Sequence, residues 1–139
     1  HAGAITDMHF MLQKEVVDRM AAAHGSKVYG RLSVMLQLAC RVVPLFEVPP
    51  EAFRPPPKVD SAVVLVVPLA PHERHDADPA LVHDVVKAAF GQRRKTLGNA
   101  LKQLLDADAI READVDPRAR AETLAPGDFV RLAKRLAVR

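Results

Sequence analysis

The sequence predicts an α/β fold in which a small sheet with its helices is followed by an all-helical part. Valine-rich strand patterns alternate with amphipathic helix patterns up to about residue 71, and beyond residue 78 only helix patterns occur. The chain has 139 residues, of which 49% are apolar and 27% charged, so it can bury a core. We expect a sheet part over residues 1–71, a linker over 72–77 and a helical part over 78–139.

The sheet part should contain three strands and two helices. Val16, Val17 and Met20 share one face of an amphipathic helix, and Gly25 is a suitable place for the chain to leave it. Runs rich in valine predict strands, the first of them buried. The expected elements are a strand over residues 5–13, helices over 14–23 and 33–43, and strands over 42–48 and 61–69.

The connector over residues 49–60 is rich in proline. Eight of the 11 prolines fall between Pro44 and Pro71, and Pro55, Pro56 and Pro57 are consecutive. Because proline fixes φ, this connector should be a stiff, extended loop that can present a side chain at little entropic cost.

In the helical part, Asp78 and Asp116 each precede a proline, which is the pattern of an N-cap residue before the first helical position. Apolar residues then recur at helical spacing and predict three helices that bury their apolar faces against one another. These residues are Leu81, Val82, Val85, Val86, Ala89 and Phe90, then Leu97, Ala100, Leu101, Leu104 and Leu105, and finally Phe129, Leu132, Ala133 and Leu136.

Composition argues against several classes of protein. The longest apolar run, residues 62–67, is far shorter than a membrane span, and we expect neither an export signal nor a membrane partner. The single cysteine, Cys40, lies in an apolar stretch, which suits a buried free thiol in the cytoplasm. The six glycines are dispersed, so no glycine-rich loop cradles a nucleotide.

Basic residues concentrate in the last third of the chain. Residues 1–90 hold 9 Lys and Arg against 10 Asp and Glu, whereas residues 91–139 hold 11 against 7. Such an excess suits a phosphate-rich partner, although a solvated helix face is an equally ordinary explanation.

Two motifs are candidates for function. In FRPPPKVDSAV, residues 53–63, Phe53 lies on the proline loop, where it either packs into the core or offers an aromatic surface to a ligand. In FGQRRKTLGNAL, residues 90–101, Arg93, Arg94 and Lys95 are expected in the first turn of a helix, where cations oppose the helix dipole. A polyanionic partner would explain that placement.

Other polar clusters are weaker candidates. His72, His75 and Asp76 could be imagined as metal ligands, but they lie in the linker without a second ligand cluster, so we expect no metal. Glu15 and Asp18 could form a carboxylate pair, although neighbouring cations favour an ordinary charged helix face. We therefore assign no catalytic residue.

Four motifs resemble the dimethyladenosine transferases of small-subunit ribosomal RNA. They are MHFMLQKEVVDRM, SKVYGRLSVM, VPPEAFRPPPKVDSAVV and FGQRRKTLGNAL, in this order and spacing. Related enzymes that methylate large-subunit RNA share the aromatic loop but lack the FxQRRKT pattern, which favours the small-subunit group.

The resemblance implies a fold, a reaction and site residues. The fold would be the last three strands of a doubly wound, Rossmann-like methyltransferase sheet, with residues 61–69 antiparallel between the other two strands, followed by an all-α domain that binds rRNA. The reaction would transfer methyl groups from S-adenosylmethionine to the exocyclic amines of two adjacent adenosines, in ribosome small-subunit biogenesis. Two sets of site residues follow. The target-base pocket would include Phe53, Pro55, Pro57 and Lys58, and the rRNA contacts would include Arg93, Arg94, Lys95, Lys27 and Arg31.

The family's glycine-rich loop for S-adenosylmethionine, its acidic ribose-binding position and its Asn-Leu-Pro-Tyr motif are not found in this sequence. We therefore expect this chain alone to bind no S-adenosylmethionine and to lack activity, and to self-associate through an exposed strand edge. The alternatives are a non-enzymatic module that binds rRNA during assembly and a helical DNA-binding regulator.

Overall fold

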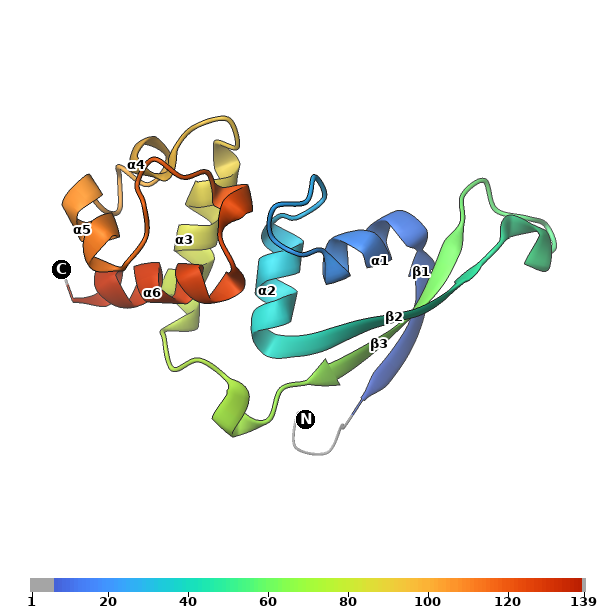
Figure 1. Ribbon diagram of the computed structural model, residues 1–139. Coiled ribbons are helices and arrows are strands. Elements are labelled where there is room, and N and C mark those ends of the chain that lie inside the picture. Colours follow the sequence, from blue (N-terminus) through green and yellow to red (C-terminus); the bar gives the residue numbers. More distant parts are fainter. Residues whose placement is uncertain (1–6, 139) are drawn as a thin grey trace.

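The computed structural model describes residues 7–138 and has the α/β architecture that the sequence predicts, with a three-stranded sheet followed by helices (Figure 1). The strands are β1 (Met8–Gln13), β2 (Cys40–Val48) and β3 (Ser61–Pro68). Strand β3 lies between the other two and is antiparallel to both, which is the predicted order. Residues 5 and 6 of the expected first strand lie outside the described residues.

Helices α1 (Lys14–Ala21) and α2 (Arg31–Ala39) join β1 to β2 and lie on one side of the sheet (Figure 1). Alternate residues of β3 face them, and a small core forms there. Its buried members are Val17, Met20, Ala62, Val64 and Val66.

The other face of the sheet is apolar and largely open. The register places Met11 of β1 and Phe46 of β2 opposite Val63, on the side away from α1, and these two side chains are 54% and 60% exposed. The expectation of a buried first strand is therefore wrong for the described residues, since most of β1 is exposed.

Two boundaries differ from prediction at the junction of α2 and β2. The helix begins at Arg31, where the Ser33 hydroxyl accepts a hydrogen bond from the Gly30 amide at 3.1 Å, and it ends at Ala39 instead of continuing to residue 43. Residues 40–43 pair with residues 65–68 of β3 instead, and the β-branched Val42 and Val43 suit the sheet. Cys40, expected to be buried, is half-buried.

The helical part contains α3 (Pro79–Gly91), α4 (Leu97–Ala100), α5 (Ala107–Glu112) and α6 (Pro126–Ala137). The Asp78 carboxylate caps α3 by accepting from the Ala80 amide at 2.9 Å, as predicted. Asp116 instead caps a single turn, because the carbonyl of Pro117 accepts the Gly98 amide and that of Ala119 accepts the Leu97 amide at the start of α4. The predicted helix start at Asp116 is therefore wrong.

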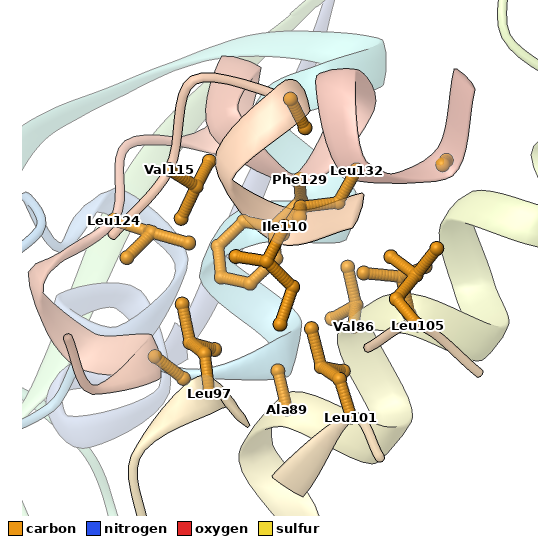
Figure 2. Packing of buried hydrophobic residues seen from close by; sticks show 14 of the residues in the cluster. Val86, Ala89, Leu97, Leu101, Leu105, Ile110, Val115, Leu124, Phe129 and Leu132 are labelled. Carbon is orange, nitrogen blue, oxygen red and sulfur yellow. The ribbon is translucent and has the colours of Figure 1, made fainter. Parts of the chain in front are cut away.

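The main core of the molecule lies among these helices. Phe129 is fully buried at its centre, surrounded by Leu97, Ile110 and Leu132 (Figure 2). Side chains from the sheet part, among them Tyr29, also belong to this core. No helix of the described chain is both long and apolar enough to cross a membrane.

Candidate functional site

The proline loop leaves the sheet at the edge where two strands end. Gln13 and Val48, the last residues of β1 and β2, both pair with Ser61, so these two strands run in the same direction on either side of β3 and end at the same edge of the sheet. Ligands of open α/β sheets bind at the carboxyl ends of parallel strands. The loop over residues 49–60 is therefore well placed to border a binding site.

Phe53 lies partly exposed on this loop. It belongs to neither buried cluster of the described residues, which argues against a simple core role. A 3₁₀ turn over Pro50–Ala52 precedes it, and its amide donates to the Pro50 carbonyl at 3.1 Å. Pro55 and Lys58 are exposed and Pro57 is half-buried, so the candidate pocket residues share an accessible loop.

A hollow of about 260 Å³ opens where the loop rejoins the sheet. The backbone of Asp60 is tied to α1 by a bond from the Lys14 amide to the Asp60 carbonyl at 2.9 Å. The Lys14 ammonium donates to Asp18 at 2.9 Å, and this hydrogen bond raises the pKa of Lys14. The possible carboxylate pair is thus an ordinary charged helix face, since the Arg19 guanidinium likewise contacts Glu15 at 2.9 Å.

A second hollow, of about 350 Å³, adjoins the first and is basic. Val28 lines both hollows, so they form one surface. Its cationic lining residues are Arg19, Lys27, Arg31 and Arg93. Among the described residues, no carboxylate side chain lines this hollow, which makes it suitable for an anion.

The basic motif lies in a turn and not in a helix. Residues 92–96 separate α3 from α4, whose N-cap is Thr96. The expectation that Arg93, Arg94 and Lys95 open a helix is therefore wrong. They follow the C-terminus of α3, where the helix dipole favours positive charge, so their placement costs no helix stability and by itself gives no reason to infer a polyanionic partner.

Sequence reasoning missed Tyr29. It is fully buried, and its hydroxyl donates to the carbonyl of Leu124 at 2.7 Å. Its ring meets that of Phe90 edge to face at 6.0 Å, and burial raises its pKa. A lone tyrosine in a chain that is 4% aromatic, in the middle of a recognised motif, is a signal that could have drawn attention to it.

The structure thus gathers some of the candidate residues and separates others. Lys27, Arg31 and Arg93 surround one hollow although up to 66 residues separate them. The proline loop lies at the far end of the sheet from the helical part (Figure 1). Within residues 7–138, no three His, Cys, Asp or Glu side chains come together in a way that could hold a metal ion.

The described fold matches part of the fold of two solved methyltransferases. A crystal structure of a dimethyladenosine transferase from Plasmodium falciparum superposes with a TM-score of 0.81 at 24% identity, covering 95% of this chain and 57% of that one. The 23S rRNA methyltransferase ErmE superposes with a TM-score of 0.66 at 21% identity, covering 96% and 55%.

The chain belongs to the ribosomal RNA adenine dimethylase family, which it matches over residues 1–138. It is 63% identical over 133 residues to ribosomal RNA small subunit methyltransferase A of Xanthomonas oryzae pv. oryzae strain PXO99A, and equally to that of Xanthomonas euvesicatoria pv. vesicatoria. These matches cover 96% of the chain and 51% of each relative, so the chain spans about half the length of the relatives that it matches.

Proposed function

We propose that this chain is the rRNA-gripping portion of an enzyme that dimethylates the exocyclic amines of two adjacent adenosines in small-subunit rRNA, during small-subunit biogenesis in the cytoplasm. The observation that carries the proposal is the pair of adjoining hollows. One is basic, the other lies at the base of the proline loop, and Val28 lines both. Membership of the adenine dimethylase family supports the choice of reaction.

The chemistry needs positioning more than acid–base help. The lone pair of an exocyclic adenine amine is delocalised into the ring, so the amine attacks well only when it is held in line with the methyl carbon. The base must first leave its stack, and an aromatic surface can hold it afterwards. We assign that surface to Phe53, with Pro55 and Pro57 stiffening the loop and Lys58 beside it.

The basic hollow would hold the RNA backbone. Lys27 and Arg31 border it from the sheet part, and the turn with Arg93, Arg94 and Lys95 adjoins it from the helical part. Cations from both parts can then contact phosphates on either side of an extruded base. Such contacts release counterions, so binding should weaken steeply with salt.

S-adenosylmethionine supplies the methyl group to the whole enzyme. The described residues do not fit this cofactor, because they hold no glycine-rich turn whose amides could approach it closely. We propose that the three strands belong to a larger doubly wound sheet that carries the cofactor, and that this chain alone binds none. Titration calorimetry with S-adenosylmethionine tests this, and micromolar binding by the 139-residue chain would refute it.

RNA binding tests the assignment of the basic residues. Replacing Arg94 and Lys95 together by Ala should lower the slope of log affinity against log salt by about two for a small-subunit rRNA fragment. Arg118→Ala, at an exposed position away from the hollow, is the matched control. An unchanged slope in the double variant would remove this turn from the interface, and a preference for duplex DNA would favour a DNA-binding regulator.

Phe53→Ala in the full-length enzyme tests the base pocket. Loss of a stacked base is worth about 1–3 kcal/mol, so kcat/KM for methylation should fall by about tenfold or more while the fold is preserved. Phe46→Ala, which removes another phenylalanine ring from the sheet part, is the control. Full activity of the Phe53 variant would return that residue to a structural role.

A further inference from the structure

The three cations of the basic turn are not equivalent. The Arg93 guanidinium donates from Nη2 to the Tyr29 carbonyl at 3.1 Å and to the Lys27 carbonyl at 3.5 Å. The same nitrogen lies 3.6 Å from the Glu122 carboxylate. For Arg94 and Lys95, by contrast, no side-chain hydrogen bond or ion pair occurs within residues 7–138, although all three residues are exposed.

The two carbonyl groups that Arg93 contacts, those of Lys27 and Tyr29, belong to a loop that is docked on the helical part. The Gly25 amide donates to the Glu122 carbonyl at 2.6 Å, and the Tyr29 hydroxyl donates to the Leu124 carbonyl. Arg93 adds a third contact between the loop and the helical part. Its guanidinium contacts the loop carbonyls and lies 5.9 Å from the centre of the Phe90 ring, at the end of α3. The loop over residues 24–30 is therefore held at several points, and in the part of the chain that the structure describes Arg93 is the one cation whose side chain donates to its carbonyls.

This attachment matters for the cations that the loop carries. Arg93 donates to the backbone carbonyl of Lys27, and Arg31, the first residue of α2, follows the docked loop directly. Lys27 and Arg31 both line the basic hollow. When the loop is displaced, the geometry of that hollow changes although no RNA-facing cation has been lost.

We propose that Arg93 is a positioning residue, which places Lys27 and Arg31 for RNA by anchoring the loop over residues 24–30, while Arg94 and Lys95 contact phosphate directly. This inference rests on the proposed function and assigns different roles to the cations of the basic turn. A guanidinium reaches several acceptors at once in a plane, whereas an ammonium acts as a compact point charge. Charge-conserving substitutions therefore separate the two roles.

The first experiment compares Arg93→Lys with Arg94→Lys. The affinity of the 139-residue chain for a synthetic small-subunit rRNA hairpin is measured at fixed salt, with Arg93→Ala and Arg94→Ala alongside. Arg94→Lys should bind within about twofold of the unchanged chain, because a phosphate contact needs chiefly the charge. Arg93→Lys should bind about as weakly as Arg93→Ala. Arg93→Lys binding as well as the unchanged chain, with Arg93→Ala weak, would overturn the proposal.

The second experiment needs no RNA. Hydrogen exchange of the amides of residues 24–30 should become faster in Arg93→Lys and stay unchanged in Arg94→Lys, with circular dichroism confirming that both remain folded. Unchanged exchange in Arg93→Lys would overturn the anchoring role. If the unchanged chain bound no RNA, the proposed function would fail while this measurement still decided whether Arg93 anchors the loop.

Glu122→Gln provides a variant that leaves every cation in place. If Arg93 did not hold the loop, exchange of the amides of residues 24–30 would be unchanged in this variant. Anchoring predicts faster exchange, because the guanidinium loses the carboxylate that lies 3.6 Å from it. Unchanged exchange in Glu122→Gln would therefore contradict the proposal, whereas RNA affinity does not separate the two roles, since loss of a carboxylate strengthens the binding of a polyanion in either case.

Discussion

The sheet part and the helical part bury their apolar residues very differently. In the helical part, the core is packed around Phe129 and includes side chains from the segment between α1 and α2. The sheet covers one face with α1 and α2 and leaves Met11 and Phe46 exposed on the other. Stability should therefore come mainly from the helical core, while the open face and the free edge of β1 make the sheet a surface for association.

The sharpest test of this contrast pairs two phenylalanines. Phe129→Ala should destabilise the chain by about 3–5 kcal/mol, because Phe129 is fully buried. Phe46→Ala should change stability by less than about 0.5 kcal/mol, because Phe46 is 60% exposed. Urea unfolding measures both, and similar losses would show that the open sheet face is buried in solution.

Tyr29→Phe tests how strongly the two parts are joined. The substitution leaves the buried Leu124 carbonyl without its donor, at a cost of about 1–3 kcal/mol. Unfolding followed by circular dichroism measures the loss. An unaffected midpoint would mean that this hydrogen bond contributes nothing to the junction.

High pH should weaken the same junction. Burial raises the pKa of Tyr29, so above the ordinary tyrosine pKa of about 10 the unfolded chain loses a proton that the folded chain keeps. Stability should then fall by about 1.4 kcal/mol for each further pH unit up to the folded pKa. In Tyr29→Phe, the chain's single tyrosine is gone and this component of the pH dependence should vanish.

The smallest expected effect concerns the free edge of β1. Met11→Lys places a charge on the exposed strand, where it should oppose edge pairing between copies without disturbing the core. Sedimentation at several concentrations should show self-association of the unchanged chain and less of it in the variant. A monomer at every concentration in both chains would remove the proposed self-association.

Local patterns predicted most of this fold because they act over short stretches. The Asp78 cap, the alternation along β3 and the apolar face of α6 are each decided by neighbouring residues. The failures involve distant partners: β2 begins at Cys40 because β3 pairs with it, and Asp116 starts no helix because α4 takes the nearby carbonyls.

The same reason limits what could be known of the site. The motifs identified Arg93 and the proline loop, but neither spacing nor composition shows that Arg93 points at Lys27 and Tyr29 across 64 residues or more of chain. The docking of the loop over residues 24–30 on the helical part engages Arg93, and Arg94 and Lys95 are left to contact a ligand. The roles of Phe53 and its loop stay predictions.

The place of Tyr29 bears on how this protein can be dissected. A cut at the predicted linker, residues 72–77, would release a helical fragment without Tyr29 and Val34, both of which are fully buried in its core. Such a fragment would carry a water-filled slot beside Phe90 in place of a tyrosine ring. A fragment that begins before the loop, at about residue 22, would keep Tyr29 beside Phe90. Unlike the helical fragment, it should still unfold cooperatively.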